Sequence, residues 1–241
     1  MYEYMKEGDK MTSTKALQYL SRDPITHMDM MAPIKRGSAQ IIYAGDDGVC
    51  IFETKSSAHI MTVETPELGK SLISEFGKVS MVSFHQEFML ELFDESRFVT
   101  KLENYQAVYT AREKLAMPKE MTIMPVSAAH LGFVISNYDF NVGAEYLRER
   151  VEEGKLFGGF VKGEMVGFIG IHSEGSIGIF KVLSEYRGKG YGAGLAAHAT
   201  NYQLSRKITP FVQFGVDNEV SLATAKKLGY KVSNKKIYWL F

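Results

Sequence analysis

Hydrophobic residues along this chain recur in short runs. In some runs they alternate as in a β-strand, and in others they follow the spacing of a helix. In the first half, the pattern predicts helix over most of residues 1–36, with Asp23 and Pro24 at a helix start and Gly37 at its end. The strands expected next lie at 40–44, 49–54, 59–63, 79–84 and 105–110, with helices at 66–76 and 87–93. Short polar turns join the first three strands, which favours an antiparallel meander.

The second half begins again with a strand and two helical stretches. The expected elements are a strand at 121–125, helices at 128–136 and 144–153, strands at 156–161, 165–172 and 176–183, a helix at 190–206, a strand at 209–216, a helix at 218–228 and a strand at 231–241. This order mixes hairpins with helical crossovers and predicts an α+β fold with a mixed α/β sheet. The charged segment 111–119, which contains Pro118, is expected to link two domains, 1–118 and 119–241.

Composition narrows the class of protein. Apolar residues make up 45% and charged residues 23% of the chain, which excludes fibrous and disordered proteins. The longest apolar stretch, Met165 to Ile171, is too short to cross a bilayer, and the charged first residues do not resemble a signal peptide, so we expect no membrane partner. The single cysteine, Cys50, is expected in the core. Since no disulfide is required, we expect a cytoplasmic location, and the spacing of the histidines predicts no metal site.

Charge and glycine are unevenly distributed. The chain carries 28 basic and 28 acidic residues, yet from Gly175 onward there are 10 basic and 3 acidic ones. Of the 22 glycines, 12 fall between Gly154 and Gly194. A basic, glycine-rich segment indicates an anionic partner that the backbone approaches closely.

The chemistry is concentrated where a strand runs into a glycine loop that opens a helix, between Phe180 and Gly192. Unpaired N–H groups at a helix start bind anions, and Arg187 and Lys189 add positive charge there, so we expect phosphate binding. A P-loop motif is absent. Gly188-x-Gly190-x-x-Ala193 fits the dinucleotide pattern, but this loop does not follow the first strand of the domain, and the residues at 206–207 are basic, so both observations argue against a nicotinamide cofactor. A purely structural turn is the alternative.

Arg187-x-x-Gly190-x-Gly192 resembles the acyl-CoA-binding signature of the GNAT N-acetyltransferase superfamily. Further on, Asn218, Ser221 and the Leu-Gly-Tyr at 228–230 are similar to a second motif of that family. The resemblance covers residues 119–241 and is greatest to the C-terminal domain of two-domain members of the glycine N-acyltransferase-like group. In those proteins the N-terminal half is a degenerate copy of the same fold, and we expect this of residues 1–118, which lack the loop.

The resemblance implies acetyl-CoA, or another acyl-CoA, as cofactor. The strand at Phe180, Lys181 and Val182 would pair with the pantetheine arm. The pyrophosphate would be wrapped by Arg187, Gly188, Lys189, Gly190, Tyr191 and Gly192. Asn218 and Ser221 would contact the cofactor from the next strand–helix junction.

Two positions depart from the family pattern. Ala225 stands where many relatives place a tyrosine acid, and Ile179 where many place a glutamate base. The nearest candidate catalytic groups are His172 and Glu174 as bases and Ser221 as a proton donor. The alternative is that His172 simply ends a strand and Glu174 is a solvated turn residue.

By analogy, the acceptor would lie near the helices at 128–153. Phe133, Tyr138, Asp139 and Phe140 combine aromatic surface with one acid, which suits an ammonium group. Alternatively, the aromatics belong to the core and Asp139 caps the next helix.

The sequence therefore predicts an N-acetyltransferase that moves an acetyl group from acetyl-CoA to a primary amine of a small molecule or amino acid, by direct transfer in a ternary complex. The alternatives are a non-catalytic acyl-CoA-binding or sensing protein and a transferase for macromolecular amines. The net negative charge of residues 1–120 argues against a nucleic-acid partner. The oligomeric state is left open.

Overall fold

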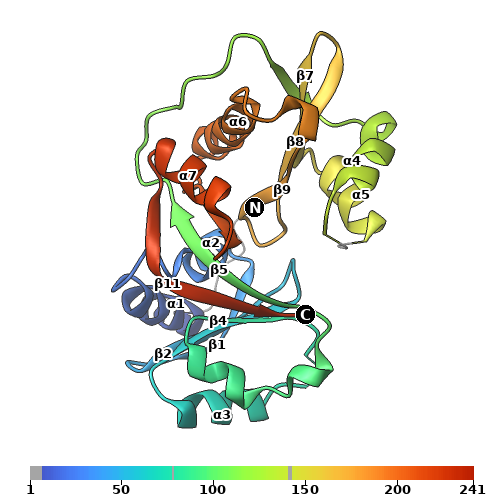
Figure 1. Ribbon diagram of the computed structural model, residues 1–241. Helices are drawn as coiled ribbons and strands as arrows, with labels where there is room; N and C mark the ends of the chain where they lie inside the picture. The colour runs from blue at the N-terminus through green and yellow to red at the C-terminus, as the bar shows by residue number, and fades with distance from the viewer. Residues whose placement is uncertain (1–6, 78, 141–142) are drawn as a thin grey trace. The chain divides into compact units, whose positions relative to one another are not determined.

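The structure is a computed structural model that describes residues 7–77, 79–140 and 143–241 (Figure 1). By compactness the chain forms two units. The first combines the described residues up to Ala107 with Phe214–Glu219 and Val232–Phe241, and the second comprises Val108–Gln213 and Val220–Lys231. The predicted division into domains 1–118 and 119–241 stays a prediction. Compactness groups the final strand with the first unit.

The first unit holds helices α1 to α3, strands β1 to β5 and nearly all of β11. Their bounds are α1 Glu7–Leu20, α2 Met28–Arg36, β1 Ala39–Ala44, β2 Gly48–Glu53, β3 Ala58–Val63, α3 Pro66–Ser74, β4 Val82–Phe84, β5 Lys101–Val108 and β11 Lys231–Leu240. The strands follow the order β1-β2-β3-β4-β11-β5. The expected antiparallel meander is present as β1–β2–β3, whereas β3 and β4 are parallel.

The predicted helix start at Asp23 and Pro24 is wrong, although Gly37 ends α2 with a φ of 77° as expected. Asp23 closes a turn instead, because its Oδ1 accepts the Thr26 N–H at 3.2 Å and its carbonyl accepts the His27 N–H at 3.0 Å. The helix expected at 87–93 is a 3-10 helix, Glu87–Leu92.

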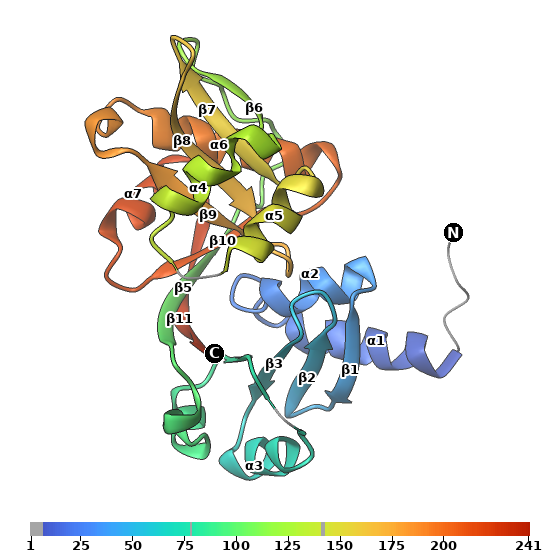
Figure 2. The ribbon, with the colours of Figure 1, turned by 90° about the vertical axis from the view of Figure 1, so that its right-hand side faces the viewer.

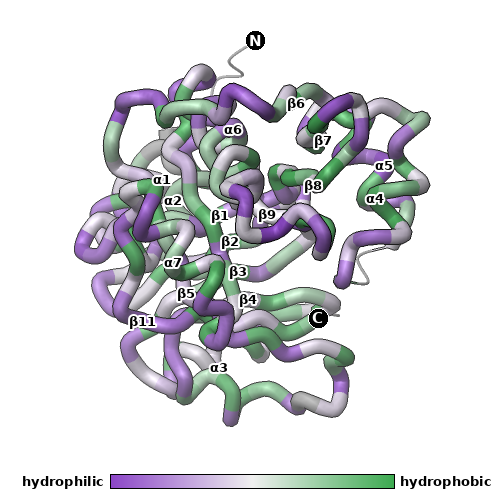
Figure 3. Tube along the Cα trace, turned by 45° about the horizontal axis from the view of Figure 1, so that its top comes forward, coloured by the Kyte–Doolittle hydropathy of each residue, from purple (hydrophilic) through white to green (hydrophobic). Residues whose placement is uncertain are grey.

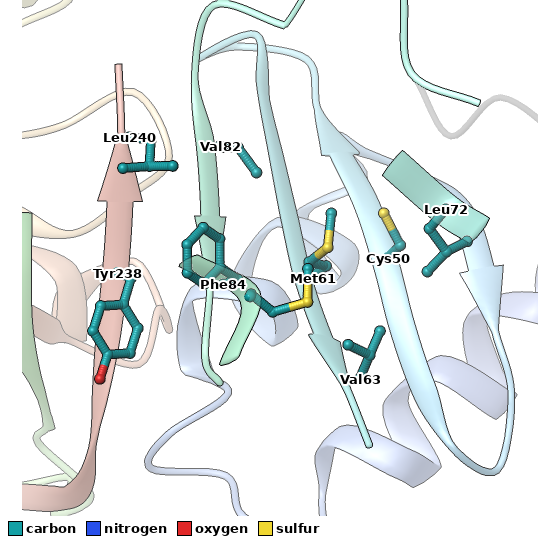
Figure 4. Packing of buried hydrophobic residues seen from close by; sticks show 9 residues of the cluster. Cys50, Met61, Val63, Leu72, Val82, Phe84, Tyr238 and Leu240 are labelled. Carbon is teal, nitrogen blue, oxygen red and sulfur yellow. The ribbon is translucent and has the colours of Figure 1, made fainter. Parts of the chain in front are cut away.

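One core cluster of the first unit lies between its sheet and α3, and α1 and α2 bury further apolar side chains, among them Leu20 and Met30. Figure 4 shows Cys50, Met61 and Phe84 from three neighbouring strands beside Tyr238 of β11. Cys50 is fully buried, as expected, and burial raises the pKa of its thiol to about 12. It is a packing residue.

The second unit has the order β10-β9-β8-β7-β6 in its sheet. The bounds are β6 Thr122–Pro125, α4 Leu131–Asn137, α5 Ala144–Glu152, β7 Leu156–Val161, β8 Glu164–Ile171, β9 Ile177–Val182, α6 Tyr191–Ser205, β10 Phe211–Gly215 and α7 Glu219–Lys227. Helix α6 covers one face of β7–β9 and α4 with α5 covers the other (Figures 1 and 2). Strand β8 is buried at every position from Met165 to Ile171, so both of its sides are covered. Figure 3 shows the hydropathy of each residue along the chain.

One order of elements occurs in both units: two helices, three antiparallel strands, a helix and a parallel strand. The two copies differ at the crossover. Glu64 and Thr65 alone connect β3 to α3, whereas residues 183–190 connect β9 to α6. In addition, β3 and β4 pair at three register positions, whereas β9 and β10 pair, among the described residues, at Val212 and Ile177 alone. Of the two copies, only the second has a long loop before the crossover helix and a pair of parallel strands that are joined at a single register position.

Candidate active site

Strand β9 carries a bulge in its middle. Phe168 of β8 is opposite Lys181 and Gly170 is opposite Gly178, so β9 holds one extra residue. Ile179 has a φ of 49° in this bulge and is almost fully buried. A β-branched residue in the left-handed region is strained by about 1–2 kcal/mol. Strain of this kind is concentrated at functional sites, because the surrounding packing must hold it.

The loop after β9 presents backbone N–H groups and positive charge. Arg187 Nε donates to the Val182 carbonyl at 3.2 Å, and Lys189 Nζ donates to the Glu185 carbonyl at 3.1 Å. Gly188 and Gly190 have φ values of 75° and 82°, and an added Cβ at either would have no atom within 4 Å. Gly190 precedes the first turn of α6, whose N–H groups lack intrahelical acceptors. The loop thus has the composition and backbone of an anion site.

The start of α6 packs closely against β9. A Cβ at Gly192 would lie 3.1 Å from Phe180 Cζ and 3.5 Å from Val182 Cγ2. The structure thereby brings together three of the predicted cofactor residues, while Tyr191 begins the helix beside them. Phe180 remains 38% exposed.

On the other face of β9, two residues predicted for different roles form an ion pair. Lys181 Nζ lies 2.6 Å from Asp139 Oδ1 and 2.7 Å from Oδ2. Lys181 was expected at the cofactor and Asp139 at the acceptor. The pair joins the segment after α4 to the strand that carries the bulge.

The remaining acceptor candidates divide between core and surface. Phe133 and Tyr138 pack against the apolar cluster under α4 and α5, and the Tyr138 ring lies edge-on to Phe168 with centroids 6.3 Å apart. Burial is the main cause that raises the pKa of Tyr138. Phe140 is 58% exposed. The core interpretation therefore fits Phe133 and Tyr138, whereas Asp139 is paired with Lys181 and Phe140 is exposed.

The candidate bases lie at the turn between β8 and β9. His172 Nδ1 is 2.8 Å from the Tyr146 hydroxyl oxygen of α5. Glu174 is 8% exposed and accepts the Ser176 hydroxyl, so it is not the solvated turn residue of the alternative. Sequence reasoning missed Tyr146, which gives no motif signal.

The two positions that depart from the family pattern are buried. Ile179 is 1% exposed and Ala225 is 6% exposed. Neither residue carries an ionisable side chain. Ser221 lies in α7, and Asn218 precedes this helix and donates its N–H to the Gly215 carbonyl at 2.9 Å. Their contact with a cofactor stays a prediction.

Within the described ranges, no group of three or more histidine, cysteine, aspartate or glutamate residues could hold a metal ion. Across the same ranges, no helix is long and apolar enough to span a membrane.

Comparison with known proteins gives one family match. Residues 156–240, from β7 to the end of β11, match the model of the FR47-like protein family. This span includes the loop after β9 and Asn218. No curated protein matches the sequence.

Several solved structures share the fold at low identity. A Drosophila protein gives a TM-score of 0.63 at 16% identity, covering 97% of this chain and 88% of its own. A GNAT-family acetyltransferase from Colwellia psychrerythraea gives 0.53 at 16% identity, with 99% and 98% coverage. A GCN5-related N-acetyltransferase-like protein from Streptococcus suis gives 0.54 at 14% identity, with 93% and 99% coverage. The predicted α+β class is confirmed, and the family match with these neighbours supports the resemblance to the GNAT superfamily.

Proposed function

We propose that this protein is an acyl-CoA-dependent N-acyltransferase that moves an acetyl group from acetyl-CoA to a primary amine of a small molecule or amino acid. The observation that carries the proposal is the junction of β9 and α6. There, a bulged strand that pairs with β10 at one position runs into a glycine loop at a helix start. In this proposal the chain is a two-domain member that resembles the glycine N-acyltransferase-like group.

The residues at this junction fit coenzyme A. The N–H groups from Gly188 to Gly192 would bind the pyrophosphate, and the exposed Arg187 and Lys189 would add charge at its rim. The edge of β9 that faces β10 would hydrogen-bond the amides of the pantetheine arm. Asn218, just before α7, and Ser221, in α7, would contact the cofactor. The cofactor supplies the activated acyl group as a thioester, and the protein holds it.

Transfer needs little more than position and fixed dipoles. Amine attack on the thioester carbonyl forms a tetrahedral oxyanion, which a backbone N–H turned out of the ladder near the bulge would stabilise. Holding amine and thioester together removes much of the entropic barrier. Because a thiolate leaves readily, the apolar Ala225 does not prevent the reaction.

A second function follows from the apolar, buried residues Ile179 and Ala225 at these two positions, which would also suit an acyl-CoA-binding or sensing protein without catalysis. A transferase for a macromolecular amine is the third. Both transferases release free thiol when their acceptor is present, whereas the binding protein does not.

Titration calorimetry with acetyl-CoA tests the cofactor, with NADH as the control ligand. We expect one acetyl-CoA site per chain, because the first unit lacks the loop and the separated strands. At a ligand concentration of about 100 Kd, the protein should gain about 2.7 kcal/mol in stability. Thiol release with a panel of amines, amino acids and peptide N-termini then identifies the acceptor. Absence of acetyl-CoA binding would overturn the proposal.

Replacing Gly190 by alanine should weaken acetyl-CoA binding at least about tenfold, or about 1.4 kcal/mol. The new methyl group would stand in the open space above the loop and would also be strained at a φ of 82°. Gly37→Ala is a matched control, since its φ is 77° and its added Cβ also meets nothing within 4 Å. Both variants should lose about 1–2 kcal/mol of stability from strain. Equal acetyl-CoA affinity in the two variants would contradict the placement of the pyrophosphate.

A further inference from the structure

His172 is held in one orientation by two contacts with Tyr146. Its Nδ1 lies 2.8 Å from the Tyr146 oxygen, and the two rings stack with centroids 6.1 Å apart at an angle of 19°. The Tyr146 oxygen also accepts the Ser173 N–H at 3.3 Å. Helix α5 therefore fixes the imidazole at the end of β8.

The other nitrogen of His172 faces β9. A Cβ added at Gly178 would lie 2.4 Å from His172 Nε2 and 2.5 Å from Cδ2. The imidazole thus occupies the place of a side chain at residue 178, directly before the strained Ile179. Under the proposed function, this is the stretch of β9 beside which the thioester carbonyl would lie.

Three groups face the imidazole. Tyr146 and Arg150 come from α5, and Glu174 comes from the turn. Burial is the main cause that lowers the pKa of His172, Glu174 raises it and Arg150 lowers it. The ring is therefore neutral near pH 7, as a proton acceptor must be. Burial raises the pKa of Tyr146 to about 12, so its hydroxyl keeps its proton.

The other acids near the site are occupied. Glu174 accepts the Ser176 hydroxyl, and Asp139 is paired with Lys181. Arg150 Nη2 lies 3.1 Å from Glu153 Oε1. His172 is left as the neutral base that faces the bulge.

We propose that His172 Nε2 is the catalytic base that takes a proton from the acceptor amine, and that Tyr146 is a positioning residue for it. In this role the Nδ1 proton is donated to the Tyr146 oxygen, which leaves the Nε2 lone pair for the substrate. The proposal rests on the function proposed above and assigns its proton acceptor.

The step balances without a further reactant. The amine nitrogen bonds to the thioester carbon, and its proton passes to Nε2. The carbon–sulfur bond then breaks, the thiolate leaves with the bonding electrons, and Nε2 returns the proton to sulfur. The products are the N-acetyl amine, free thiol and the neutral imidazole.

The test uses three variants of the full chain and the amine found by thiol release. His172→Gln removes the base, Tyr146→Phe removes its hydroxyl partner, and Gly178→Ala displaces the ring without changing it. His198→Gln is the matched control, because His198 also has a pKa lowered by burial but packs on Phe157 under α6. The readouts are acetyl-CoA affinity and kcat/KM as a function of pH.

In the wild-type protein, kcat/KM should fall as pH drops through the His172 pKa, at a midpoint below the ordinary value of 6.5. His172→Gln should lower kcat/KM about 100-fold and remove this acidic limb, with acetyl-CoA affinity within about twofold of wild type. Tyr146→Phe should keep the limb but move its midpoint. Gly178→Ala should lower kcat/KM about tenfold or more, and His198→Gln should leave the profile unchanged.

The outcomes separate the two proposals. Failure of the wild-type protein to bind acetyl-CoA or release thiol overturns the function itself. Turnover by His172→Gln with an unchanged acidic limb overturns the base alone. If His172→Gln does not fold, an unaltered pH profile in both Tyr146→Phe and Gly178→Ala overturns it equally.

Discussion

Replacing Asp29 by alanine is expected to lower the free energy of unfolding of the first unit by about 3 kcal/mol or more. Asp29 Oδ2 lies 3.0 Å from His85 Nε2, and both side chains are fully buried. The imidazole of His85 also stacks on His27, with centroids 5.2 Å apart. Removing the carboxylate leaves a buried N–H group with no acceptor, and the lost volume adds to the destabilisation.

Urea unfolding followed by tryptophan fluorescence measures this effect, because Trp239 is the sole tryptophan and lies in β11 of the first unit. Glu64→Ala is the control, since its pair with Arg22 is more than half exposed and should contribute less than about 1 kcal/mol. Asp29→Asn keeps an acceptor oxygen, so its loss of unfolding free energy should lie between those of Asp29→Ala and Glu64→Ala. Equal stability of Asp29→Ala and Glu64→Ala would contradict the importance of the buried pair.

Acidification is expected to destabilise the same unit strongly between pH 6.5 and 4. Burial, followed by the neighbouring His85, lowers the pKa of His27 from 6.5 to about 4. In this window the unfolded chain binds a proton at His27 that the folded chain does not, so stability falls as pH falls. The shift corresponds to about 3 kcal/mol. Above pH 6.5 the contribution of His27 to the pH dependence disappears.

The measurement compares urea midpoints at pH 7.5 and 4.5 for the wild-type protein and His27→Phe. Phenylalanine keeps a ring in the stack beside His85 but does not titrate, and it loses the contact of Nδ1 with the Leu20 carbonyl at 3.0 Å. His27→Phe should be less stable than the wild-type protein at pH 7.5. Its urea midpoint should fall much less than that of the wild-type protein between pH 7.5 and 4.5. An unchanged difference between the two pH values would show that His27 is not the responsible group.

Most helices and strands could be predicted because each is short and bounded by turn residues. Thr65 and Pro66 illustrate this, since the threonine side chain accepts the Leu68 N–H and the proline starts α3 where expected. Asp23 and Pro24 carry a similar signal, yet a tight turn satisfies the aspartate first. A capping residue indicates that its side chain accepts a hydrogen bond from a nearby backbone N–H group. Several kinds of turn supply such a group, so the residue alone does not predict a helix start.

The candidate site could be predicted only where its residues are consecutive in the sequence. The glycines and basic residues from Arg187 to Gly192 are one continuous segment, so their pattern is visible. The bulge is not, because Ile179 is a residue that favours ordinary strands, and its φ of 49° comes from the packing around it. Tyr146 and His172 meet because α5 crosses the end of β8, and no local pattern encodes which helix face does so. Gly178 is the one available signal, since glycine inside a strand often marks a close approach.

The position of β11 has a consequence for the order in which the protein matures. In the first unit this strand lies between β4 and β5, although it follows all the other strands in the sequence. During synthesis on the ribosome, β4 and β5 therefore emerge long before the neighbour that completes their ladder. Nascent chains would carry two unpaired strand edges until β11 has been synthesised, which favours chaperone binding during this interval. Helices and strands of the second unit are translated within this interval, so the sheet of the first unit is completed only after the second unit has been synthesised.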